Sequence, residues 1–144
     1  MNEPYVTLQG WVGTEVDLRE AGEHPCAGFR LACTPRYRKD GVWVDGATSW
    51  FTVNCWRGLA ANVRDSVRRG DAVIVHGRVR VEVWQREGHP PATTWVVEAS
   101  FVGHDLNRGT SVFTKAPARS RAEDGVLVHG EEVSPVAEQV EPAA

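Results

Sequence analysis

Polar and apolar side chains alternate along five stretches of the chain, which is the pattern of strands that bury one face. Between the third and fourth stretches the period changes, because Leu59, Val63 and Val67 recur every four residues before Gly70. This spacing predicts one short helix of about three turns over residues 58–69. The alternating stretches are residues 5–13, 29–33, 50–56, 72–86 and 93–103.

The resulting order is three strands, one helix and two strands. A five-stranded Greek-key barrel with its helix between the third and fourth strands has this order, and it is known as the oligonucleotide/oligosaccharide-binding (OB) barrel. We therefore predict an all-β domain with one short helix over residues 1–104. Periodicity fades beyond it, where Ala, Pro, Glu, Ser and Gly dominate. Residues 105–144 are expected to form a disordered tail, because they bury too little apolar surface to offset the entropy of ordering.

Two connections in the predicted barrel are long. Residues 15–28 are polar and rich in Gly and Pro, which indicates a short continuation of the first strand followed by a turn. Residues 35–47 carry basic and aromatic side chains and are expected to form a long hairpin loop. In this loop Trp43, between Val42 and Val44, begins a small ladder.

Large aromatic side chains occur on faces that the alternation assigns to water. Trp50 and Trp56 alternate with apolar neighbours, and Trp84 shares its face with arginines. Such side chains either pack on another subunit or under a loop, or they form a ligand surface. Three of them beside arginines favour a ligand surface, because unpaired bases stack on π-faces while arginines hold phosphates. The side chains expected to face inward on the last two strands are Val73, Val75, Val79, Val81, Val83, Trp95, Val97, Ala99 and Phe101.

Composition limits the classes of protein to consider. The chain of 144 residues, 42% apolar, fits one β-rich domain with a tail. It contains no apolar run of membrane-spanning length and no secretory start, so a cytoplasmic protein without a membrane partner is expected. Charges balance over residues 1–104, and the net charge of −3 arises in residues 105–144. Local basic stripes therefore stay compatible with a polyanion partner.

Residues suited to catalysis or metal binding show no recognised spacing. The sequence has no Gly-rich loop with Lys, no paired metal-binding His and no Cys-x-x-Cys. We therefore expect neither an enzyme nor a cofactor or metal. Cys33 and Cys55 fall on apolar faces, whereas Cys26 falls in a Gly/Pro-rich turn that could expose it. A disulfide within or between chains stays open.

Three blocks of sequence resemble the bacterial single-stranded DNA-binding proteins, and the resemblance extends over residues 3–104. The blocks combine an aromatic-containing strand, a short helix ending in a basic residue and Gly, and a Val/Ile strand with an inner Gly. The resemblance implies an oligomeric barrel, usually a homotetramer, that wraps unpaired DNA in replication, recombination or repair near the nucleoid. The blocks are Thr48-Ser49-Trp50-Phe51, Cys55-Trp56-Arg57-Gly58-Leu59-Ala60 and Arg68-Arg69-Gly70-Asp71-Ala72-Val73-Ile74-Val75-His76-Gly77-Arg78.

The resemblance also carries the family's stacking side chains onto four positions, Tyr37, Trp50, Trp56 and Trp84. Tyr37 stands where Trp is frequent and Trp56 where Phe is frequent, and both keep a π-face. Three of the four are the outward aromatics that the alternation identifies independently. Nearby cations are candidates for phosphate contacts, although each alone is equally consistent with a solvated surface charge. These cations are Arg36, Arg38, Lys39, Arg57, Arg78, Arg80 and Arg86.

The end of the chain departs from the family pattern, which is an acidic peptide closing on Pro-Phe. Acidic residues are present, from Glu131 to Glu141, but Pro142-Ala143-Ala144 follow without a terminal aromatic. This departure puts recruitment of the usual replication and repair partners in question, and it suggests a secondary member of the family as a hypothesis.

Two other functions fit a barrel with outward indoles. A carbohydrate-binding module would also stack rings on Trp, but carboxylates and amides should then line the face, where cations are found instead. A purely structural oligomerisation module would place the same indoles between subunits. Binding of unpaired DNA without strong sequence preference is the favoured hypothesis.

Overall fold

The computed structural model describes residues 2–117. The chain divides into two units, Met1–Val112 and Phe113–Ala144, and the first contains the helix and the strands found in the described residues. The predicted disordered tail therefore lies mainly outside the described residues. At its start the chain still bonds to the barrel, because the Asp105 N–H donates to the Ala72 carbonyl at 2.9 Å.

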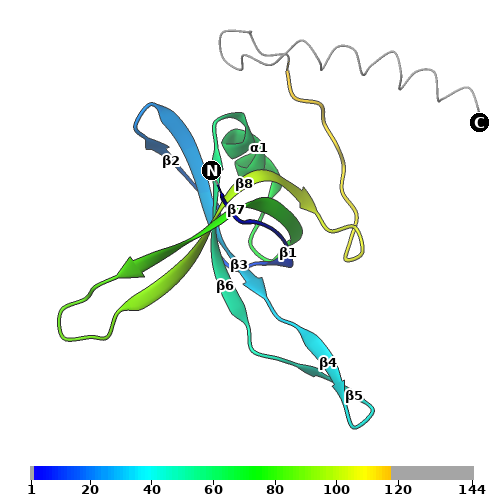
Figure 1. The fold of residues 1–144 in the computed structure, drawn as a ribbon. Helices are drawn as coiled ribbons and strands as arrows, with labels where there is room; N and C mark the ends of the chain where they lie inside the picture. Colours follow the sequence, from blue (N-terminus) through cyan, green and yellow to red (C-terminus); the bar gives the residue numbers. More distant parts are fainter. Residues whose placement is uncertain (1, 118–144) are drawn as a thin grey trace, which may run out of the picture. The chain divides into compact units, whose positions relative to one another are not determined.

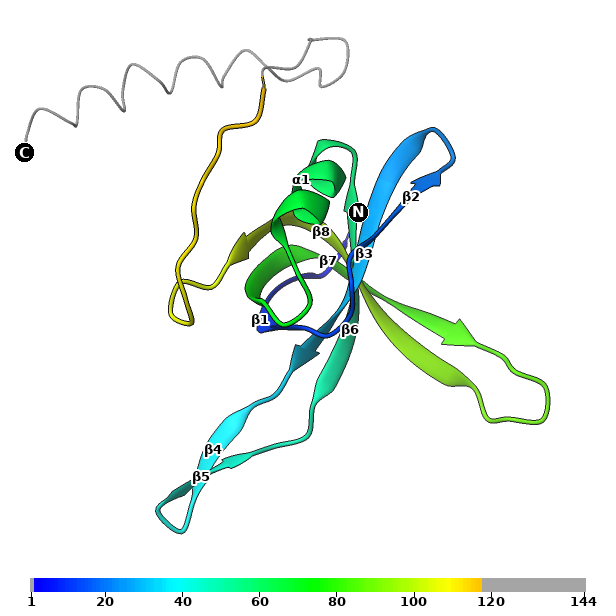
Figure 2. The same cartoon turned by 180° about the vertical axis from the view of Figure 1, so that it is seen from behind.

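Five strands close into a barrel, namely β1 (Tyr5–Val12), β3 (His24–Cys33), β6 (Ser49–Trp56), β7 (Ala72–Trp84) and β8 (Ala92–His104). Their order around the barrel is β1–β7–β8–β6–β3, and pairing of β1 with β3 closes it. Strands β6 and β8 are parallel, and the other pairs are antiparallel. Helix α1 (Gly58–Ser66) connects β6 to β7 (Figure 1, Figure 2). The predicted OB barrel, with its helix between the third and fourth barrel strands, is confirmed.

Alternating side chains from the barrel strands fill the core. Val53 and Cys55 on β6, and Val73 and Val75 on β7, have no exposed surface. Full burial of one such aliphatic side chain stabilises the fold by about 1.5–3 kcal/mol relative to exposure. The inner faces of the barrel strands therefore form the hydrophobic core, and their outer faces are available for other contacts.

Helix α1 covers part of this core with Ala60 and Val63. It begins after Arg57, whose φ of 60° turns the chain sharply out of β6. It ends at Ser66, because Val67 adopts an extended backbone conformation, although its N–H still bonds the Val63 carbonyl. The helix is therefore shorter than the predicted range of residues 58–69.

Two further strand pairs occupy the long connections. Strand β2 (Asp17–Ala21) pairs with the first half of β3, and the expected turn is confined to residues 22–23 between them. The sequence did not predict this edge strand or the early start of β3. An edge strand of this kind can be polar, because it needs little more than backbone pairing. Strands β4 (Arg36–Lys39) and β5 (Val42–Asp45) form a separate ladder, which confirms the small ladder expected around Trp43.

Two hairpins extend beyond the barrel on the side away from α1 (Figure 1, Figure 2). The first arm is the β4–β5 hairpin, residues 36–45, and the second arm is the outer part of β7 and β8, residues 81–95. On the second arm Val81, Val83 and Trp95 are 44%, 63% and 47% exposed. The expectation that these three face the core is wrong, because they continue the inner face past the point where the barrel encloses it.

A bulge in β8 changes the alternation near its end. His76 pairs with Phe101 and the next residue, Gly77, pairs with Ala99, so Ser100 is the extra residue. Phe101 therefore turns to the outer face, where it is 57% exposed and stacks on His76 with ring centroids 4.9 Å apart. The inward placement expected for Phe101 is wrong for this reason.

The three cysteines are free thiols. Cys26, expected in a turn, instead lies inside β3 with no exposed surface, because that strand begins at His24. Burial, with smaller contributions from Cys26 and Glu98, raises the pKa of Cys55 to about 12. Burial also raises the pKa of Cys33, which is only partly covered.

We expect Cys33 to be the one thiol of the three that a water-soluble aromatic disulfide modifies in the folded chain at pH 8. Reaction requires an accessible thiolate, and burial withholds both access and ionisation from Cys26 and Cys55. Mass spectrometry of digested protein identifies the labelled residue, and the Cys33→Ser variant should not be labelled while it is folded. Labelling of Cys26 or Cys55 before denaturant is added would contradict this assignment.

Candidate nucleic-acid interface

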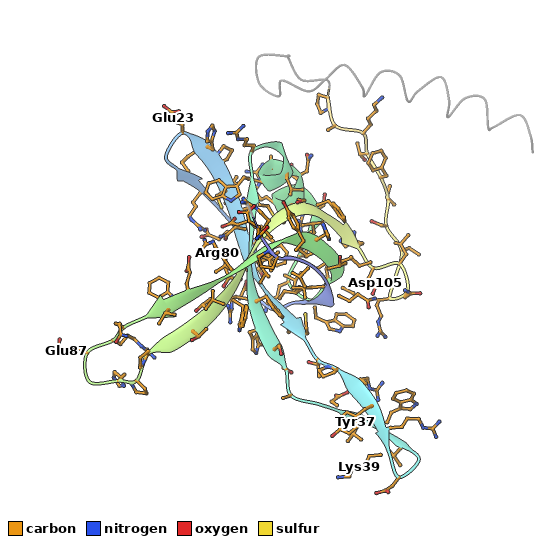
Figure 3. All side chains as sticks on the ribbon, in the orientation of Figure 1. Glu23, Tyr37, Lys39, Arg80, Glu87 and Asp105 are labelled. Carbon is orange, nitrogen blue, oxygen red and sulfur yellow. The ribbon has the colours of Figure 1, made fainter. Side chains whose placement is uncertain are left out.

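The four aromatic side chains predicted to stack bases are all exposed. Tyr37 is 49%, Trp50 44%, Trp56 37% and Trp84 54% accessible. Tyr37 lies on the first arm (Figure 3). Trp84 lies on the second arm, while Trp50 and Trp56 lie towards the two ends of β6. Solvent therefore reaches part of each of these rings, as base stacking requires.

Trp50 has a defined setting on the outer face of β6. A Cβ atom on Gly13 would lie 2.5 Å from the Trp50 ring, so the missing side chain makes room for the indole. The Arg30 guanidinium lies 5.7 Å from the ring centroid and donates to the Thr52 hydroxyl at 2.7 Å. Arg30 was not among the predicted phosphate contacts, yet it places a cation beside this platform.

The first arm presents different side chains on its two faces. Cross-strand pairing places Tyr37 opposite Val44 on one face, and Arg38 opposite Trp43 on the other. The Arg38 guanidinium lies 5.8 Å from the centroid of Trp43, which is 56% exposed. The arm therefore carries a second aromatic beside a cation. The exposed Lys39 lies near its tip (Figure 3).

Three predicted cations lie apart from one another. Arg36 is paired with Asp45 on the first arm, Nε to Oδ1 at 3.0 Å. Arg86 is exposed in the turn that closes the second arm. Arg57 lies at the start of α1, with its Nη2 3.3 Å from Nε2 of His24. The structure therefore does not gather all predicted cations into one cluster.

Trp56, Arg78 and Arg80, in contrast, line one surface hollow of about 450 Å³ on the outer face. Its central group is the Glu98 carboxylate, which accepts from the Trp56 indole N–H at 2.8 Å and from Arg80 Nη2 at 3.0 Å. A longer bond of 3.4 Å comes from the Asn54 amide. Burial alone would raise the pKa of Glu98, but these hydrogen bonds outweigh it, so the pKa lies below its ordinary value.

Both β7 cations of this hollow are paired with carboxylates. Arg78 bonds Glu3 at 2.9 Å, and Arg80 bonds Glu82 as well as Glu98. These pairs are at least partly exposed, so their attraction is modest. Arg78 and Arg80, which were predicted to contact phosphates, are therefore already paired with carboxylates of the chain.

The alternation in sequence missed a stack of aromatic rings on the outer face of β1, β7 and β8. His76 lies between Tyr5 and Phe101, with ring centroids 5.8 and 4.9 Å away, and its Nδ1 lies 2.8 Å from the Thr7 hydroxyl. The outward position of Tyr5 was readable from the strand period, but that of Phe101 depends on the bulge. This stack adjoins the hollow beside Trp56, because Tyr5 pairs with Arg78, which lines the hollow.

Two classes of site are absent from residues 2–117. Their one α-helix is too short and too polar to span a bilayer. Within the same residues, no three His, Cys, Asp or Glu side chains come together in an arrangement that could hold a metal ion.

Comparison with known proteins gives a consistent result. The model of the "Single-strand binding protein family" matches residues 4–104. "Single-stranded DNA-binding protein 2" of Streptomyces avermitilis is 44% identical over 128 residues, which cover 88% of this chain and 80% of the relative. "Single-stranded DNA-binding protein 1" of Streptomyces coelicolor is 41% identical over 124 residues, which cover 85% and 78%.

Solved structures agree with these relatives. The crystal structure of a small single-stranded DNA-binding protein from Streptomyces coelicolor has a TM-score of 0.70 and 41% identity, and the match covers 76% of this chain and 100% of that one. The second single-stranded DNA-binding protein of Mycobacterium smegmatis has a TM-score of 0.61 and 29% identity, with coverage of 79% and 100%.

Proposed function

The chain belongs to the single-strand binding protein family, whose members bind DNA and are not enzymes, and on that basis we propose that it binds unpaired DNA on its outer face. Bases stack on Tyr37, Trp50, Trp56 and Trp84, and each contributes about 1–3 kcal/mol to binding by alanine substitution. Because every base has a π-face, the chain discriminates little between sequences.

The observation that carries this proposal is the combination of exposed indoles and guanidinium groups along one surface. Trp84, Arg80 and Arg78 alternate on the outer face of β7, and Trp56 joins them through Glu98. Phosphate contacts come from this face and from the arms. The cations that make them are Arg36, Arg38, Lys39, Arg57, Arg78, Arg80 and Arg86, to which the position of Arg30 over Trp50 adds one more.

We also propose that the chain acts as a homotetramer on unpaired DNA at the nucleoid. Tyr5, Trp11 and Phe101 are 58%, 47% and 57% exposed on the outer side of the β1 region, and large exposed apolar side chains are typical of interaction sites. Protection of unpaired strands in replication, recombination or repair follows from the binding activity. Light scattering of the full chain tests the tetramer, and a monomeric mass would refute it.

Affinity for an unpaired oligonucleotide is expected to fall steeply with salt. Each phosphate neutralised by a cation contributes about −0.7 to the slope of log K against log salt for single strands. Titration of labelled oligo-dT and of a duplex of equal length, at several NaCl concentrations, measures both the slope and the strand preference. Duplex DNA should bind more weakly, because its bases are already stacked. Equal affinity for both, or no salt dependence, would count against the proposal.

The same titration separates the other candidate functions. A carbohydrate-binding module would bind oligosaccharides and show little dependence on salt. A purely structural module would bind neither ligand. Oligo-rU in place of oligo-dT shows whether the surface also accepts RNA.

A further inference from the structure

The Arg80 guanidinium lies between two carboxylates that differ in their surroundings. Nη1 bonds Glu82 from the same strand, and Nη2 bonds Glu98 from β8 at 3.0 Å. The Glu98 side chain is only 16% exposed and is also bonded to Trp56, whereas Glu82 is 35% exposed and is bonded to Arg80 alone among residues 2–117. Hydrogen bonds to Glu82 and Glu98 raise the pKa of Arg80.

This ion pair lies between two of the stacking platforms. On β7, Arg80, Glu82 and Trp84 are two residues apart and share the outer face. Trp56 is linked to the other side of Arg80 through Glu98. A strand of DNA whose bases stack on both indoles therefore passes its phosphates over Arg80 and Glu82. An anionic side chain at this place opposes the proposed ligand.

A carboxylate and a phosphate present the same group to a guanidinium, namely two anionic oxygens able to accept parallel N–H bonds. We propose that Glu82 occupies on Arg80 the place of a DNA phosphate, so that binding of unpaired DNA exchanges the Glu82 carboxylate for a phosphate. Glu98 stays in place and positions both Trp56 and Arg80. The inference rests on the proposed function and adds a competing residue to it.

The exchange has two measurable consequences. It weakens binding, because the Arg80–Glu82 pair must open before the phosphate contact forms. It also lowers the salt dependence, because the released carboxylate attracts a cation while the phosphate releases one. Both effects are modest, because exposed ion pairs are individually weak and screened at physiological ionic strength.

The test is the affinity of the full chain for labelled oligo-dT after Glu82→Gln. We expect binding about two- to fivefold tighter at 0.15 M NaCl, with the salt slope steeper by up to about 0.7. Glu87→Gln is the matched control, because it removes the same charge from the tip of the same arm, where Glu87 pairs with no cation within residues 2–117 (Figure 3). Glu82→Thr, which suits an exposed strand position, repeats the test with a second side chain.

A double-mutant cycle with Arg80→Gln identifies the mechanism. If Glu82 acts by occupying Arg80, the gain from Glu82→Gln disappears in the Arg80→Gln background, and Arg80→Gln alone costs little. An equal gain in both backgrounds, or an equal gain from Glu87→Gln, would show a general charge effect and overturn the inference. If the unaltered chain does not bind oligo-dT at all, the proposed function itself is refuted.

Discussion

Replacing Trp50 or Trp84 by alanine is expected to weaken binding of an unpaired oligonucleotide by about 1–3 kcal/mol each, or roughly five- to 150-fold. Both indoles are exposed, so their removal takes away a stacking surface without opening the core. Fluorescence anisotropy of labelled oligo-dT at fixed salt measures the loss. A label on the DNA is needed, because the chain contains six tryptophans whose emission overlaps.

Trp95→Ala is the matched control for these variants. Trp95 is 47% exposed, close to the 44% of Trp50 and the 54% of Trp84, but it pairs with Val81 and so lies on the opposite face of the second arm. Its removal should leave affinity nearly unchanged. If Trp95→Ala weakens binding as much as the other two, or if those two bind normally while folded, the strand passes over a different face.

Gly77→Ala is expected to lower the free energy of unfolding by about 1–3 kcal/mol. A Cβ atom at Gly77 would lie 2.2 Å from the Glu98 carbonyl oxygen and 2.8 Å from the Cα atom of Ala99. Both are backbone atoms of the neighbouring strand, so no side-chain rotation relieves the overlap. Strands β7 and β8 must move apart at the bulge, which urea unfolding at fixed protein concentration measures.

Gly103→Ala provides the comparison for this variant. Gly103 also lies in β8, but a Cβ atom there would have no heavy atom within 4 Å. Its substitution should change the free energy of unfolding by no more than about 0.5 kcal/mol. Equal stability of the two variants would mean that the backbone at Gly77 yields more easily than its close contact indicates.

The order of elements and the outward indoles were predictable from the sequence because each depends on a local period. Trp50 and Trp56 are an even number of residues apart in one strand and so lie on the same face, and apolar residues at every fourth position indicate the helix. The edge strand β2 was missed because it is polar and depends on pairing with β3 rather than on an apolar face of its own. Local sequence patterns therefore predict the strands that enclose the core better than they predict an edge strand.

The surroundings of the predicted cations could not be predicted, because they depend on register between strands. Arg80 meets Glu98 only because β7 and β8 pair as they do around the bulge. The same bulge turns Phe101 outward onto His76. No period within one strand reveals an extra residue in its neighbour, so the ion pairs and the aromatic stack appear only in three dimensions.

The two arms are strand ladders that lie outside the barrel interior. Their length can therefore change the extent of the binding surface without disturbing the core of the fold. Adding two residues to each strand of an arm would make the arm longer, and every aromatic ring on its outer face would stay on that face. A single added residue before Trp84 would instead turn that indole to the reverse side, while the buried valines nearer the helix kept their places. Extension by twos is thus the route by which such an arm could be redesigned for longer strands.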